Sequence, residues 1–222
     1  MVDQPGRHLP HDFDADIATV RERLKAMSER CRSQLHLALD AFWTGSKAKM
    51  ADVEVSDNAI DLDEKAIDEI VLRILALRQP VATDLRMLTS CFKLVTDLER
   101  IGDEAVDIAR VTVSSGPDGE PTRERLRRMA QTTEGLVAQA TSSYLDGDVR
   151  SAERVRQDSD AVEILYREIL DVSVDFMSKH PTEVVATMCN MSVAKCLERI
   201  ADHAVNIAKG TLFVVRGEPM PR

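Results

Sequence analysis

A fifteen-residue motif that occurs twice is the feature that most constrains this chain of 222 residues. Residues 96–110 read TDLERIGDEAVDIAR, and residues 195–209 read KCLERIADHAVNIAK. Nine of the fifteen positions are identical, and both apolar and acidic positions are retained. A tandem repeat of one structural unit explains this agreement better than shared composition does. The fold must therefore contain the same unit twice.

Apolar residues recur along the chain at spacings of three and four, which is the period of an amphipathic helix. Breaks in this pattern coincide with Gly45, Pro80, Gly147 and Pro181, residues that end helices. The pattern predicts one helix in each of the segments 13–43, 46–79, 81–113, 122–145, 148–179 and 182–216. We therefore predict an all-α fold of six long helices, a tandem repeat of two antiparallel three-helix bundles.

The boundary between the repeats is marked by the run Ser-Ser-Gly-Pro-Asp-Gly-Glu-Pro at residues 114–121. Clustered Gly, Pro, Ser and Asp interrupt helices and favour loops. The predicted domains are therefore 12–115 and 121–216, with 116–120 as the linker.

Charge and cysteine content restrict the class of protein. The 29 basic residues are outnumbered by 38 acidic ones, giving a formal charge of −9, which argues against binding to nucleic acid. Four cysteines lie within apolar helical patterns and form no CxxC pair, so we expect reduced core thiols: Cys31, Cys91, Cys189 and Cys196. With no apolar signal region in the sequence, the expected location is the cytoplasm.

Acidic residues of the first repeat are expected to meet between its second and third helices. Glu99 and Asp103 lie one turn apart at the edge of an apolar face. An acidic stripe on the preceding helix contains Asp57, Asp61, Glu64 and Asp68. The two helices join at residues 79–80, and the midpoints of 57–61 and 99–103 are equidistant from this turn. Antiparallel packing should therefore bring together Asp57, Asp61, Glu99 and Asp103.

The same argument applied to the second repeat uses the turn at residues 180–181. Positions 160 and 200 are equidistant from residue 180, so Asp158 should approach Glu198 and Asp202. In this register the position that matches Asp61 is Val162, so one carboxylate is missing. We expect a weaker site in the second repeat.

Converging carboxylates need a cation nearby, or some of them must become protonated. Their oxygens suit Mg, Ca, Mn or iron, and zinc also accepts carboxylates. The alternative is a solvated helix edge neutralised by Arg100 and Arg199. Spacing alone leaves both interpretations open.

Catalytic motifs are missing from the sequence. None of the five histidines follows a glutamate by three residues, as a di-iron carboxylate enzyme in a helical bundle would require. His203 adjoins Asp202 but lies 100° from it around the helix, so we expect an edge residue and not a metal ligand. The sequence also contains no phosphate-binding loop and no nucleophile elbow. We therefore predict that the protein is not an enzyme.

Three segments carry a resemblance to a known family. LALRQPVATDLRML (75–88), LERIGDEAVDIAR (98–110) and LERIADHAVNIAK (197–209) resemble the PhoU family over essentially the whole chain. The resemblance implies two pseudo-symmetric three-helix bundles, often dimeric, with a multinuclear iron or zinc centre. It assigns as metal ligands the pairs Glu99 with Asp103 and Glu198 with Asp202, and their partners Asp57, Asp61 and Asp158. Val162 departs from the acidic residue often found there.

The resemblance also implies a function. A protein of this kind would be a non-enzymatic negative regulator of phosphate uptake and phosphate-starvation signalling. Its expected partners are the ATPase subunit of the high-affinity phosphate ABC transporter, the sensor histidine kinase of the regulon and a second copy of the chain. The alternatives are a metal-binding accessory subunit of another phosphate or cation transporter, and a carboxylate-bridged metal-storage or redox protein.

Overall fold

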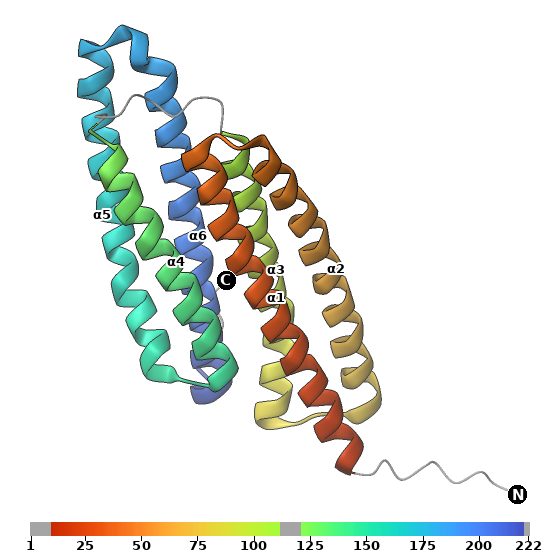
Figure 1. The fold of residues 1–222 in the computed structure, drawn as a ribbon. Coiled ribbons are helices and arrows are strands. Elements are labelled where there is room, and N and C mark those ends of the chain that lie inside the picture. Colours follow the sequence, from red (N-terminus) through yellow and green to blue (C-terminus); the bar gives the residue numbers. More distant parts are fainter. Residues whose placement is uncertain (1–9, 112–120, 220–222) are drawn as a thin grey trace, which may run out of the picture.

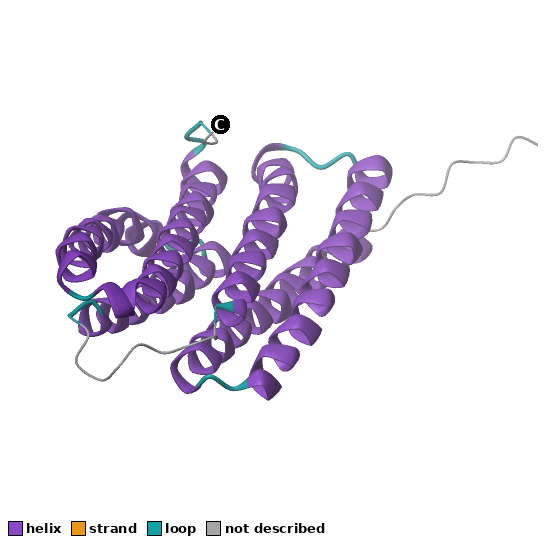
Figure 2. Cartoon of the chain, turned by 90° about the horizontal axis from the view of Figure 1, so that it is seen from above, coloured by secondary structure: helices purple, strands orange, loops and turns teal. Residues whose placement is uncertain are grey.

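Six long helices make up the computed structural model, which describes residues 10–111 and 121–219 (Figure 1). The helices are α1 Pro10–Thr44, α2 Lys47–Arg78, α3 Ala82–Arg110, α4 Arg123–Asp146, α5 Val149–Lys179 and α6 Val184–Arg216, and a short 3₁₀ helix, η1 Pro181–Glu183, precedes α6. Figure 2 shows that the regular structure of the described residues is helical throughout. The all-α prediction is confirmed. The predicted linker 116–120 lies outside the described residues, so the domain boundary stays a prediction.

Local sequence explains where these helices begin and end. Ser46 caps α2 by accepting a hydrogen bond from the backbone N–H of Lys49, and Asp148 caps α5 through the N–H groups of Arg150 and Ser151. Such side chains satisfy the unpaired N–H groups of a first helical turn. Gly147 closes α4 with a φ of +67°, a conformation that glycine adopts without steric cost.

The two repeats pack against each other through their third helices. α3 and α6 lie side by side at the centre of the molecule and run in opposite directions, and α1 faces α4 beside them (Figure 1). The duplicated motif therefore lies at the seam between the bundles. Most of its apolar positions are buried in both copies, as with Leu98 and Leu197 and with Ile101 and Ile200, and Val205 is half-buried. This burial explains why the motif is so similar in the two repeats.

Buried positions align the repeats residue by residue. The buried residues Val53, Ile60 and Ile67 of α2 each have a buried counterpart 102 positions later in α5, at Val155, Val162 and Ile169. The same offset relates α1 to α4, as in the pairs Leu24 with Leu126 and Met27 with Met129. Between α3 and α6 the offset is 99, as in the duplicated motif. We use these offsets below to name counterparts.

This alignment corrects the predicted role of Val162. Val162 is 1% exposed and matches the core residue Ile60, so it does not occupy the place of Asp61. The physical reason lies in the connection between the helices. The offset falls from 102 before the second connection to 99 after it, so this connection, which contains η1, is three residues shorter between matching positions than the first. Equal distance from residue 180 was therefore the wrong measure of register, by one residue.

Two further observations bear on the sequence predictions. Three of the cysteines are buried as predicted, but Cys189 is half-buried near the start of α6, so its assignment to the core was wrong. Within residues 10–111 and 121–219, no helix is both long and apolar enough to cross a membrane.

Candidate functional site

Four carboxylates lie close together along the contact between α2 and α3. Burial raises the pKa of Asp57, and the negative charges of Asp103 and Asp61 raise it further. Burial also raises the pKa of Glu99, with added contributions from Asp103 and Asp61. Asp61 and Asp103 therefore lie near enough to both Asp57 and Glu99 to act on their pKa, as the register argument expected.

A glycine and a glutamine shape the base of this cluster, which we call the first acidic cluster (Asp57, Asp61, Glu99 and Asp103). Gln34 of α1 donates a hydrogen bond from Nε2 to Oδ1 of Asp57 at 3.1 Å. A Cβ atom at Gly102 would lie 3.0 Å from Oε1 of Gln34 and 3.2 Å from Oδ1 of Asp57. The absence of a side chain at this position therefore makes room for both polar groups.

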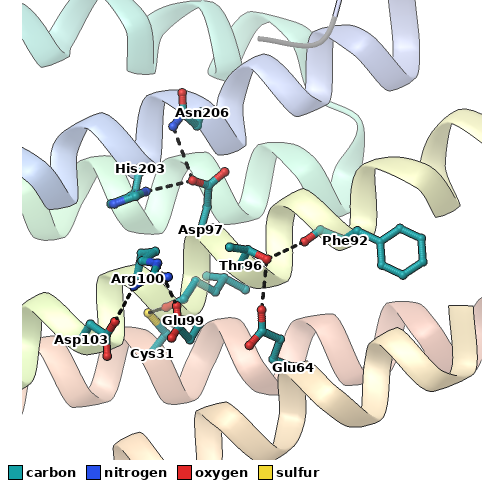
Figure 3. Close-up of polar contacts among 11 residues, drawn as sticks. Cys31, Glu64, Phe92, Thr96, Asp97, Glu99, Arg100, Asp103, His203 and Asn206 are labelled. Carbon is teal, nitrogen blue, oxygen red and sulfur yellow. Dashed lines mark hydrogen bonds and ion pairs between the residues drawn. The ribbon is translucent and has the colours of Figure 1, made fainter. Parts of the chain in front are cut away.

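The first acidic cluster is only partly neutralised by nearby cations. Arg100 contacts Oδ2 of Asp103 at 3.1 Å and Oε2 of Glu99 at 3.3 Å (Figure 3). Arg110, which forms an ion pair with Glu54 at 3.3 Å, also lowers the pKa of Asp57. Its effect is the smallest of those that act on this carboxyl group. Arginine neutralisation, the alternative to a metal, is therefore present but covers only part of the acidic charge.

The acidic surface continues along α2 beyond these four residues. Oγ1 of Thr96 donates to Oε1 of Glu64 at 3.0 Å, which holds Glu64 against α3 (Figure 3). Glu64 in turn raises the pKa of Glu99 and of Asp68, although burial is the larger cause for both. Glu64 therefore belongs beside the first acidic cluster as a possible fifth acid.

The donor chemistry of the first acidic cluster fits a hard cation. Among the described residues, Oε2 of Glu99 is buried and accepts no hydrogen bond, its one charged contact being the ion pair with Arg100, and the space beside Gly102 admits Asp57. In the part of the chain that the structure describes, no three His, Cys, Asp or Glu side chains stand close enough to hold a metal ion. Binding of a metal would therefore require rotation of these carboxylates toward a common point.

The acids of the second repeat are arranged differently. Glu198 forms an ion pair with Lys195, one turn earlier on α6. The pKa of Asp202 is raised by burial and then by Glu198, although the residue is exposed overall, so the two acids stand close together. Asp158 of α5 is exposed and, among the described residues, forms no hydrogen bond or ion pair. The structure thus joins Glu198 with Asp202 but does not bring Asp158 to them through any such contact.

The register argument missed the residue that does correspond to Asp61. This residue is Glu163, which lies 102 positions after Asp61 and pairs with Arg167 on the exposed side of α5. The spacing of seven between Val155, Val162 and Ile169 repeats the spacing of the buried residues of α2. This apolar spacing was visible in the sequence and would have identified Glu163.

Polar pairs also cross the seam between α3 and α6. Asp97, which is buried, contacts Nδ1 of His203 at 2.9 Å and accepts a hydrogen bond from Asn206 at 3.4 Å (Figure 3). Arg199 donates to Glu104 at 3.0 Å. Arg199 therefore holds the two repeats together, whereas its counterpart Arg100 contacts the first acidic cluster.

Comparison with known proteins identifies both repeats. The family model described as PhoU domain matches residues 24–112 and 126–211. A phosphate-specific transport system accessory protein PhoU homolog from Pseudomonas aeruginosa is 34% identical over 212 residues, which cover 95% of this chain and 88% of that protein. The phosphate-specific transport system accessory protein PhoU of Escherichia coli is 26% identical over 213 residues, covering 96% of this chain and 88% of that protein.

Solved structures agree with this assignment. The crystal structure of PhoU from Pseudomonas aeruginosa superposes with a TM-score of 0.87 at 33% identity, covering 92% of this chain and 99% of that one. The phosphate transport system regulatory protein PhoU from Streptococcus pneumoniae shares the fold, with a TM-score of 0.82 at 21% identity and coverage of 95% and 99%.

Proposed function

The chain belongs to the PhoU family of non-enzymatic regulatory proteins, and from this premise we propose that it is a negative regulator of the phosphate-starvation response. In this role it acts in the cytoplasm when phosphate is plentiful. It links the ATPase subunit of the high-affinity phosphate ABC transporter to the sensor histidine kinase of the regulon.

The observation that carries this proposal is the agreement of both repeats with one family. Relatives that share about a third or a quarter of their residues with this chain over nearly its whole length are accessory proteins of the phosphate-specific transport system. Association with that transport system is therefore the coarser part of the proposal. The link to the kinase is the finer part, and it needs a separate test.

We propose that the first acidic cluster binds a multinuclear centre of iron or zinc. Asp57 and Asp61 would hold it from α2, and Glu99 and Asp103 from α3. Bound there, the metal supplies positive charge that offsets the repulsion among these carboxylates and fastens α2 to α3. Gln34 orients Asp57 through its hydrogen bond, as residues behind metal ligands commonly do.

The exposed apolar side chains support contacts with protein partners, including the second copy of a homodimer. At the turn between α2 and α3, three such side chains project into solvent: Leu77, Val81 and Leu85. Exposed apolar groups gathered in one place mark interaction surfaces more often than scattered ones do. Sedimentation at micromolar concentration should find a dimer, and a chain that stays at 24.7 kDa would contradict this part of the proposal.

The regulatory function is tested by alkaline phosphatase activity in phosphate-rich medium. We compare the parent strain, an in-frame deletion of this gene and the deletion carrying the gene on a plasmid. High activity in the deletion and low activity after complementation are expected. Activity that stays low in the deletion would contradict negative regulation and favour an accessory subunit of another transporter.

The kinase link needs a second genetic comparison. Deleting the sensor kinase together with this gene should return alkaline phosphatase activity to a low level, because the proposed signal acts through that kinase. Activity that stays high in the double deletion would place the regulator downstream of the kinase or independent of it.

A further inference from the structure

The second repeat replaces most of the polar residues that surround the first acidic cluster. On α5, the counterparts of Asp57, Glu64 and Asp68 are Ser159, Tyr166 and Leu170. Of the four acids in the acidic stripe of α2, only Asp61 has an acidic counterpart on α5, and this residue, Glu163, is paired with Arg167. Of the four positions at which this stripe carries a carboxylate, α5 therefore keeps a carboxylate at only one. That carboxylate is already paired with a basic residue.

The residues below the acids also differ between the two repeats. Gln34, which orients Asp57, corresponds to the buried Leu136, and Gly102 corresponds to Ala201. A methyl group in the place of Gly102 would crowd both Gln34 and Asp57, but Leu136 and Ser159 put no such groups there. The Leu136 side chain and the Ala201 methyl group therefore stand in the second repeat where Gln34 and Gly102 make room for Asp57 in the first.

A lysine stands inside the second group of acids. Lys195 is the counterpart of Thr96, and its ammonium group pairs with Glu198 and lies 5.4 Å from the centre of the Tyr166 ring. The Thr96 hydroxyl contacts Glu64 at the matching place in the first repeat. The same two positions thus touch in both repeats, through a hydroxyl and a carboxylate in one and through an ammonium and an aromatic ring in the other. An ammonium group over an aromatic face is an attractive arrangement for a cation.

We propose that Lys195 is the resident cation of the second repeat, taking the place of a metal ion beside Glu198 and Asp202, so that metal binds to the first repeat alone. The inference rests on the proposed metal centre of the first repeat. The positive charge of Lys195 is covalently attached to the chain, so it cannot dissociate as a metal ion can. The ring of Tyr166 holds that charge against α6. A divalent ion at this place would have to displace both groups while gaining only two carboxylates.

Zinc content tests the proposal in the full chain. The protein is stripped with chelator, loaded with Zn²⁺, desalted and analysed for zinc by elemental mass spectrometry. We compare the wild type, D57N/D103N and E198Q/D202N, with circular dichroism to verify that each is folded. The E198Q/D202N protein should hold as much zinc as the wild type, and D57N/D103N should lose it. A loss of zinc in E198Q/D202N would overturn the proposal.

A wild-type chain that holds no zinc would refute the metal centre of the first repeat, and a second measurement then decides the role of Lys195. We expect Lys195→Met to lower the melting temperature by about 1–4 °C and to have little effect when Glu198 is already Gln. The control is Lys65→Met, which changes an exposed lysine of α2. An unchanged melting temperature, or one that Zn²⁺ restores, would overturn the assignment of Lys195.

Discussion

The two repeats have the same core and different polar faces. Four buried positions of α2 are also buried at the matching positions of α5, yet the residues beside them change from four acids to serine, glutamate, tyrosine and leucine. The fold depends on the apolar positions, because burial of their surface is the main source of stability. The chemistry of the site depends on a few neighbouring positions, which can change without disturbing the core.

Most of this difference lies on one helix of each hairpin. The acids Glu99 and Asp103 of α3 recur as Glu198 and Asp202 of α6, while their partners on α2 have only one acidic counterpart on α5, Glu163. α3 and α6 pack on each other as well as on their own bundles, so a change there affects two interfaces. Among the described residues, α5 packs only on α4, α6 and η1 of its own bundle, so a change there affects no contact with the other repeat (Figure 1).

The largest expected effect comes from placing an acid in the register that the symmetry argument first suggested. Val162→Asp should lower the free energy of unfolding by about 3 kcal/mol or more, because it buries a carboxylate among apolar side chains. Ser159→Asp, the matched control beside it, should change stability by less than about 1 kcal/mol. Urea unfolding measures both, and a Val162→Asp protein as stable as the wild type would contradict the corrected register.

The reactivity of the cysteine thiols provides a second comparison of the two repeats. Burial raises the pKa of Cys31 and of Cys196 to about 12 and that of Cys91 to about 11, so these thiols stay protonated at pH 8. Half-buried Cys189 should react with a disulfide reagent at least about 100-fold faster. Its counterpart in the first repeat is the buried Ser90, which is hydrogen-bonded to Tyr144.

A count of released thiolate over time checks this prediction. One rapid equivalent is expected, and it should vanish in Cys189→Ser. Two rapid equivalents would mean that the core of one repeat opens more readily than its burial indicates.

Gly102 and its counterpart Ala201 lie below the acids of the two repeats. Substituting each by the other residue type separates the effect on stability from the effect on metal binding. In Gly102→Ala, better helix propensity, worth about 1 kcal/mol, offsets the crowding of Gln34 and Asp57. Stability should therefore change by less than about 1 kcal/mol, while zinc affinity falls about 10- to 100-fold. Ala201→Gly should cost about 1 kcal/mol and leave zinc binding unchanged. Titration calorimetry and urea unfolding decide, and equal zinc affinity in Gly102→Ala would remove Gly102 from the site.

The smallest effect is expected at Glu163, the one acidic counterpart on α5 of the four acids in the acidic stripe of α2. Glu163→Gln breaks an exposed ion pair with Arg167 and should change the free energy of unfolding by less than about 0.5 kcal/mol, with no change in zinc content. Its counterpart Asp61→Asn should lower zinc affinity. If the Glu163→Gln protein lost zinc, α5 would have to contribute a metal ligand, and the contrast between the repeats would fail.

Helical periodicity was sufficient to predict the fold, including all six helices to within a few residues of their ends. It also placed Asp57 and Asp61 opposite Glu99 and Asp103, because residues 79–81 form a short turn and distance from that turn gives the register. It failed at Val162, because the form of the second connection, with η1, cannot be read from distances along the chain.

The neutralising residues were harder to predict than the acids. Arg199 stands in the duplicated motif like Arg100, yet it pairs with Glu104 of the other repeat. Only the packing of α3 against α6 reveals this partner. No sequence pattern singles out Lys195, and only the structure places Tyr166 of α5 beside it.

The opposite directions of α3 and α6 have a consequence for the reach of the molecule. The turn between α2 and α3 and the turn between α5 and α6 point away from each other at opposite ends (Figure 1). α6 alone, with 33 residues, spans about 50 Å. The two turns are therefore separated by about the length of one helix, and a contact made at one turn leaves the other turn uncovered.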